Sequence, residues 1–165
     1  MKVMLSKKYT NCLNFEHTLF LTEIYINAIL NNNGFRIIDK EYFKKDHSIF
    51  FATVREEFEK KRFSLSDEYK ENKNIFLEFI KYHKQMINEI NLKIKNITEP
   101  IYLFGGHIFS QYLFNFGLNK NKIKGLIDND SKKHNKRLYG TDKIVFSPEI
   151  LKDLKSPLVI KSWRL

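Results

Sequence analysis

Two neighbouring residues near the start of the sequence, Glu16 and His17, could act together as an acid–base pair. A histidine titrates close to neutral pH, so it can accept a proton from an activated carbon or from a hydroxyl group. The adjacent carboxylate can support the ring if the fold brings both side chains to a cleft. Taken alone, a Glu-His dipeptide is more simply interpreted as a solvated surface pair, and both interpretations stay open at this point.

A second group of candidate residues joins two glycines to an acid. Gly105 and Gly106 follow an apolar run and precede a helical pattern, so their backbone N–H groups could bind an anion at the start of the helix. Asp128 comes about 20 residues later, where nucleotide-binding folds place a carboxylate for the ribose. The glycine fingerprint is incomplete, because Ser110 and Gln111 stand near the position of a third glycine. Two interpretations remain, a nucleotide site or a tight strand-to-helix turn that binds nothing.

The pattern of residues 1–54 predicts the elements that surround the first candidate pair. An amphipathic stretch follows Thr22, a suitable helix N-cap, and closes at Gly34, which adopts a left-handed backbone conformation without strain. Two runs typical of β-strands come next, 35–43 and 48–54. A two-stranded hairpin is only marginally stable alone, so this arrangement looks like the end of a larger sheet.

Residues 55–99 are highly charged and predict one long helical segment. Apolar residues recur here every three or four positions and would form a single apolar stripe along the helix, on which His83 also lies. The members of the stripe are Ile75, Phe76, Phe79, Ile80, His83, Met86, Ile87 and Ile90. Ser64 or Ser66 offers an N-cap, and Pro100 disfavours helix in the residue before it. We interpret His83 as a core or interface histidine, because a histidine on an apolar stripe is usually part of the packing.

Residues 100–165 alternate between strand and helix patterns with short links. The expected strands are 101–104, 123–127, 143–146 and 158–160, and the expected helices begin at Ile108 and at Pro148. Such alternation is typical of a parallel α/β layer. We therefore expect an α/β fold in three parts: 1–54 as the end of one sheet, 55–99 as a helical linker, and 100–165 as a small Rossmann-like domain.

The net charge of +10 is concentrated in the last part of the chain. Residues 100–165 carry 12 basic and 5 acidic side chains, or +7, whereas 1–54 carry 7 and 5 and 55–99 carry 10 and 9. The cluster could bind phosphates: Lys120, Lys122, Lys124, Lys132, Lys133, Lys136 and Arg137. Only 5 of the 29 basic residues are arginine, the residue that binds bases and phosphates in bidentate fashion, which argues against a nucleic-acid partner.

Several classes of protein conflict with the composition. No apolar run is long enough to span a bilayer, and the N-terminus lacks the apolar core of a signal peptide. Cys12 is the one cysteine, which permits neither an internal disulfide nor a four-cysteine zinc site. We expect a cytoplasmic protein with no metal and no membrane partner.

Several motifs together resemble a known family. The first set is Asn14-Phe15-Glu16-His17-Thr18, the helix that runs to Asn33-Gly34-Phe35, and Asp46-His47-Ser48-Ile49. The second set is Tyr102-Leu103-Phe104-Gly105-Gly106, Gly125-Leu126-Ile127-Asp128-Asn129-Asp130 with Lys133, Tyr139-Gly140-Thr141, and Ser147-Pro148-Glu149-Ile150-Leu151. In this order they are similar to the closing part of S-adenosylmethionine-dependent C-methyltransferases that act on nucleotide-linked deoxysugars.

This resemblance implies roles for the candidate residues. In that family a Glu-His pair serves methyl transfer, which maps here to His17 as the base and Glu16 as its partner. The base generates a carbanion beside a sugar keto group, and the carbanion takes the methyl group of S-adenosylmethionine. The C-terminal Rossmann-like domain of the family corresponds to the part of this chain that contains Gly105, Gly106 and Asp128. The implied substrate is a nucleotide-sugar.

Other parts of the family pattern have no counterpart here. The cysteines of its zinc domain are missing, and residues 1–15 contain no glycine that could form the cofactor loop. We therefore expect a C-terminal fragment that is inactive alone and needs a complementing chain with the N-terminal half. The alternatives are a stand-alone module that binds a nucleotide or nucleotide-sugar at Gly105, Gly106 and Asp128, and a basic nucleic-acid-binding protein that uses the cluster from Lys120 to Arg137.

Overall fold

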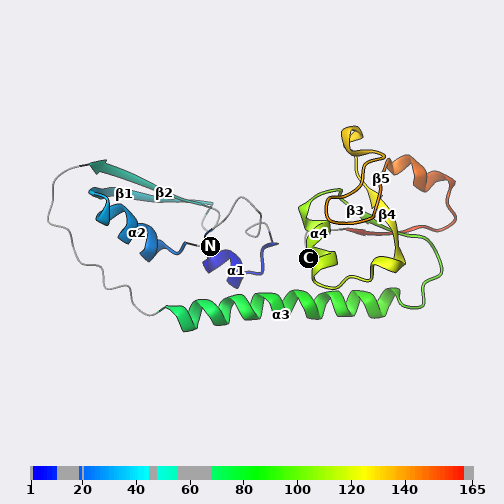
Figure 1. The fold of residues 1–165 in the computed structure, drawn as a ribbon, viewed down its shortest axis with the longest axis horizontal. Coiled ribbons are helices and arrows are strands. Elements are labelled where there is room, and N and C mark those ends of the chain that lie inside the picture. The colour runs from blue at the N-terminus through cyan, green and yellow to red at the C-terminus, as the bar shows by residue number, and fades with distance from the viewer. Residues whose placement is uncertain (1, 11–18, 20, 45–47, 56–67, 162–165) are drawn as a thin grey trace. The chain divides into compact units, whose positions relative to one another are not determined.

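Four short strands form a parallel sheet in the C-terminal part of the chain, and a separate antiparallel hairpin lies in the N-terminal part (Figure 1). The computed structural model describes residues 2–10, 19, 21–44, 48–55 and 68–161. The chain divides into two compact units, Met1–Phe79 and Ile80–Leu165. The boundary falls inside one long helix, and the predicted division at 54 and 99 stays a prediction.

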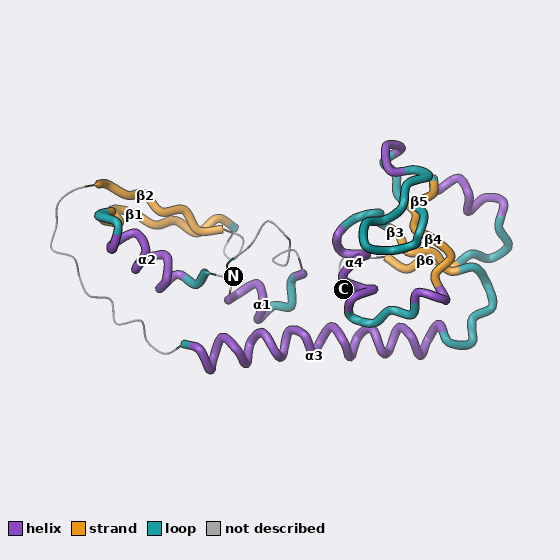
Figure 2. Tube along the Cα trace, viewed as in Figure 1, coloured by secondary structure: helices purple, strands orange, loops and turns teal. Residues whose placement is uncertain are grey.

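The parallel sheet belongs to the second unit and has the order β5-β4-β3-β6; Figure 2 labels its four strands. Its strands are β3 (Ile101–Phe104), β4 (Ile123–Ile127), β5 (Val145–Phe146) and β6 (Leu158–Lys161). The two central strands are apolar and buried nearly throughout, as expected for a parallel sheet covered on both faces. The predicted α/β fold class is therefore confirmed, with β5 shorter than the expected strand.

Short helices connect these strands. They are α4 (Ile108–Asn115), η2 (Lys120–Lys122), η3 (Ser131–Lys133) and η4 (Pro148–Asp153). The last begins as predicted, because the Ser147 side chain accepts a hydrogen bond from the Glu149 amide and Pro148 occupies the first turn. Its hydrogen-bonding pattern is that of a 3₁₀ helix.

The core of the second unit forms between the sheet, α4 and the long helix α3 (Tyr69–Ile94). Its buried members come from these elements and from the segments that follow α4 and η3: Ile87, Ile94, Ile101, Leu103, Leu113, Phe114, Leu118, Ile123, Leu126, Leu138 and Val145. His83 is 1% exposed and stacks on Phe116 with ring centroids 5.0 Å apart, which confirms its interpretation as a core histidine. The predicted caps Ser64 and Ser66 lie outside the described residues.

The first unit contains α1 (Lys2–Ser6), α2 (Glu23–Asn32), β1 (Phe35–Phe43) and β2 (Ser48–Arg55). The two strands pair antiparallel, and the register shifts by one residue at Ile38, a β-bulge. Glu23 of α2 pairs with Lys40 and accepts a hydrogen bond from the Tyr42 hydroxyl at 2.8 Å, so three side chains fasten the helix to β1. Thr22 is the N-cap residue, but its hydroxyl donates to Glu68 at 3.2 Å instead of accepting from the helix.

Candidate functional site

Glu16 and His17 lie outside the described residues. Their assignment as the partner and the base in methyl transfer therefore stays a prediction.

The structure brings Gly105, Gly106 and Asp128 together at the carboxyl ends of β3 and β4. Gly105 adopts a φ of 112°, a conformation that favours glycine, and its amide donates to the Ile127 carbonyl at 2.7 Å. The Ser110 hydroxyl is completely buried and donates back to the Gly105 carbonyl. Ser110, near the position of the missing third glycine, thus closes the turn with a hydrogen bond.

The Asp128 carboxylate accepts hydrogen bonds from three surrounding groups. Its Oδ2 accepts from the Gly106 amide at 2.7 Å and from the Lys133 ammonium at 3.0 Å. Its Oδ1 accepts from the Asp130 amide at 2.9 Å. The residue is 8% exposed, so these contacts replace most of its hydration. The carboxylate therefore ties the β3–α4 turn to the segment that follows β4.

These contacts determine the charge state of Asp128. Burial alone raises the pKa of a carboxyl group, but the hydrogen bonds from Asp130, Lys133 and Gly106, together with the positive charge of Lys133, outweigh it and lower the pKa. At neutral pH the turn therefore holds an ionised carboxylate.

Two histidines complete the surroundings of the turn. His107 is the N-cap of α4, and its Nδ1 accepts a hydrogen bond from the Phe109 amide at 3.2 Å. Burial and the charge of Lys133 lower the pKa of His107 against the opposing effect of Asp128. The Nε2 of His134 lies 2.8 Å from the Asp128 carbonyl oxygen, where it can donate. Neither histidine was predicted as a site residue from the sequence, although His107 directly follows the two glycines and His134 follows the acidic turn.

We predict that Asp128 stabilises the fold in a pH-dependent manner. The folded pKa is lowered, so its contribution is complete above the pKa of an unfolded aspartate, about 3.9, and is lost as the pH falls through the folded pKa. At neutral pH, Asp128→Asn is expected to lower the free energy of unfolding by roughly 1–3 kcal/mol. Urea unfolding at a series of pH values should show that the difference in the free energy of unfolding between the wild type and Asp128→Asn becomes smaller below about pH 4.

Asp142 provides the matched control for this measurement. Its side chain is 78% exposed and 3.6 Å from Lys143, so Asp142→Asn should change stability little at any pH. If Asp128→Asn were less stable than the wild type by the same amount at neutral and at acid pH, the ionised carboxylate would not be the source of the stabilisation.

The described residues also limit other kinds of site. Among them, no group of three or more His, Cys, Asp or Glu side chains is arranged to hold a metal ion. In the same part of the chain, no helix is both long and apolar enough to cross a membrane. Comparison with models of known protein families gives no match, and comparison with curated proteins gives none either.

Proposed function

We propose that this chain is the closing part of an S-adenosylmethionine-dependent C-methyltransferase that acts on a nucleotide-linked sugar. The observation that carries the proposal is the order of motifs and elements. A helix and an antiparallel hairpin, α2-β1-β2, come first, and a separate parallel α/β unit follows. The resemblance found in the sequence implies the same succession, with Glu16-His17 before the helix and the Asp128 motif in the last unit.

The resemblance assigns no residue of this sequence to the S-adenosylmethionine site that the activity requires. Residues 1–15 contain no glycine, and Gly105 and Gly106 lie in the unit that contains the parallel sheet. The role left to this chain is that of His17, which would remove a proton from the carbon next to a sugar keto group while Glu16 supports the resulting imidazolium.

We predict that the chain alone does not bind S-adenosylmethionine. Isothermal titration calorimetry of the full chain should give only the heat of dilution. Tight one-to-one binding would show that residues of this sequence form the cofactor loop, and it would contradict the prediction that this chain lacks the cofactor half.

Co-expression gives the positive test. If the neighbouring reading frame encodes a cysteine-rich segment and a strand with a glycine-rich loop, its product and this chain should together transfer labelled methyl groups to a nucleotide-linked keto sugar. His17→Gln should abolish the transfer, whereas Glu41→Gln, at an exposed residue of β1, should retain it. Full transfer by the His17→Gln variant would contradict the assignment of the base.

A second candidate, a module that binds a nucleotide or nucleotide-sugar, is favoured by the strand order. In β5-β4-β3-β6 the chain leaves β3 toward β4 and later returns to its other side as β6, so a topological switch point lies between β3 and β6. Open parallel sheets bind ligands outside the carboxyl ends of the strands at such a point. The Gly105–His107 turn begins there, at the end of β3.

The structure gives less support to the third candidate, a nucleic-acid-binding protein, than to a nucleotide-binding module. Lys133 pairs with Asp128 and Lys122 donates to the Ile97 carbonyl at 3.1 Å, so two members of the basic cluster have contacts within the protein. A nucleic-acid complex would have to lose affinity steeply as salt is raised.

A further inference from the structure

We propose that the Asp128 carboxylate acts as an internal anion. It accepts the hydrogen bond of the Gly106 amide just before α4, so this amide does not bind the phosphates of a ligand. The inference concerns the α/β unit alone and does not depend on the proposed methyltransferase activity. It also gives Asp128 a role that differs from the ribose-binding role expected from its sequence position.

The Gly106 amide already donates to a group of the protein itself. In phosphate-binding turns, a backbone N–H between a strand and a helix points at the anion, and the helix dipole favours negative charge there. Here the Gly106 amide donates to Asp128 Oδ2 at 2.7 Å. An entering phosphate would have to displace a carboxylate that the protein itself supplies.

The Asp128 carboxylate has few acceptor positions left for a ligand. A carboxylate has about four lone-pair positions, two on each oxygen. Oδ2 accepts from Gly106 and Lys133, and Oδ1 accepts from Asp130. One acceptor position on Oδ1 therefore remains, too few for the two adjacent hydroxyls of a ribose to donate together.

The protein packs closely around Gly106. A Cβ atom built at this glycine would lie 3.0 and 3.2 Å from the two methyl groups of Val145 and 3.3 Å from Asp128 Oδ2. In a dinucleotide-binding turn, a glycine at such a position lets the backbone approach the pyrophosphate. In this chain the backbone approaches Val145 and Asp128 instead, so the protein's own atoms use the space that glycine leaves.

Electrostatics acts in the same direction. Lys133 is the cation nearest to Asp128 in the described contacts, and the two side chains already form an ion pair. A phosphate bound at the turn would therefore lie next to the ionised Asp128 carboxylate, and Lys133 is already paired with that carboxylate. The two negative charges would repel each other, and burial would strengthen the repulsion because water screens it less.

Nuclear magnetic resonance of the ¹⁵N-labelled full chain tests the proposal at the Gly106 amide. A pH titration should shift this resonance with a midpoint below that of an ordinary aspartate, because the amide reports the charge of Asp128. Pyrophosphate should leave the resonance unchanged relative to sodium chloride of equal ionic strength. Displacement of other resonances near the β3–β6 edge, with Gly106 unchanged, would support the proposal and show that a ligand binds there through other groups.

Two variants complete the test. In Asp128→Asn the low-pH transition of the Gly106 amide should disappear, and in Lys133→Met it should remain but move to higher pH, because the carboxylate has lost its cation. Lys133→Met keeps the carboxylate and its two amide donors, Gly106 and Asp130. It therefore still tests the proposal if Asp128→Asn does not fold. Saturable displacement of the wild-type Gly106 amide by pyrophosphate, or a Gly106 titration unchanged in Lys133→Met, would overturn the proposal.

Discussion

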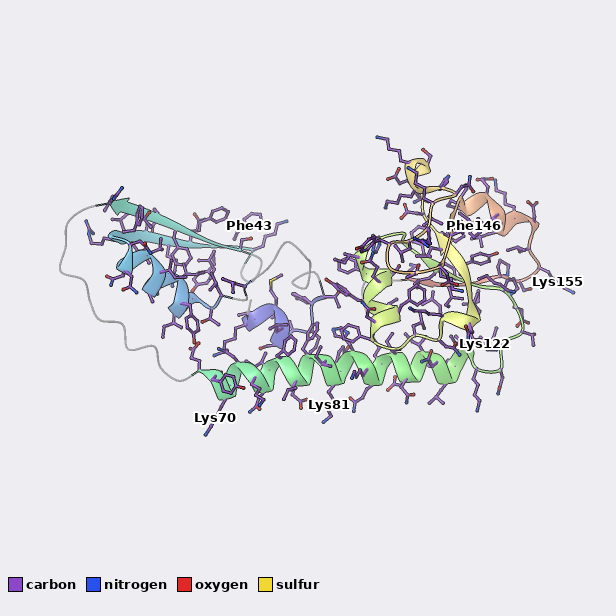
Figure 3. The ribbon with its side chains drawn as sticks, in the orientation of Figure 1. Phe43, Lys70, Lys81, Lys122, Phe146 and Lys155 are labelled. Carbon is purple, nitrogen blue, oxygen red and sulfur yellow. The ribbon has the colours of Figure 1, made fainter. Side chains whose placement is uncertain are left out.

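Replacing Gly125 with alanine is expected to destabilise the α/β unit by about 3 kcal/mol, near the upper end of the usual range for overpacking. Gly125 is buried in β4, and a Cβ atom built there would lie 2.9 Å from the Ile144 carbonyl oxygen and 2.9 Å from Cδ2 of Phe146. The carbonyl belongs to the backbone beside β4 and cannot turn away as a side chain can. Phe146, labelled in Figure 3, lies on the neighbouring strand β5 and packs edge-on against Tyr102 with centroids 6.3 Å apart.

Thermal unfolding of the full chain measures this effect. For a unit of this size, 3 kcal/mol corresponds to a fall in Tm of more than about 10 °C, and hydrogen exchange should show that the amides of β3 and β4 lose protection first. The control is Lys124→Ala, because Lys124 precedes Gly125 on the same strand and is exposed. If Gly125→Ala and Lys124→Ala melt at the same temperature, the close contact between β4 and β5 is not present in the folded protein.

The positions of the strands could be predicted because local signals and tertiary packing agree there. Ile101–Phe104 is an apolar run closed by glycines, and β3 has these bounds. The same agreement places β1 at Phe35–Phe43 after a helix that ends near Gly34. The expected helix at Pro148 is a 3₁₀ helix, because the cap signal fixes where a helix begins but not its hydrogen-bonding pattern.

The partners of the candidate site could be predicted only in part. The spacing of Gly106 and Asp128 indicated that both residues end parallel strands, which is why they meet. Spacing does not show which groups donate to the carboxylate, since the Lys133 contact depends on the 3₁₀ turn after β4. Spacing also did not show the contact of Ser110. In the sequence this residue only marked the absence of a third glycine, whereas in the structure its hydroxyl donates to the Gly105 carbonyl and closes the turn.

Gly106→Val is expected to destabilise the α/β unit by roughly 2–3 kcal/mol and to raise the pKa of Asp128. The new side chain would start 3.0 Å from a methyl group of Val145 and 3.3 Å from Asp128 Oδ2, so the turn has to move away from the carboxylate. Lengthening the hydrogen bond from the Gly106 amide removes one of the contacts that lower the Asp128 pKa. Urea unfolding gives the loss of stability, and ¹³C resonances of the carboxylate give the pKa.

A double-mutant cycle separates this close contact from a general intolerance of the turn. Val145 is 3% exposed, so Val145→Ala alone should destabilise the unit by removing buried methyl groups. It also opens the space that a Cβ at position 106 needs. Combined with Gly106→Ala, it should therefore cost less than the sum of the two single changes, with a coupling of at least about 0.5 kcal/mol. Strict additivity would mean that Val145 does not limit position 106, and the glycine would then be required for some reason other than the packing of the protein's own atoms against it.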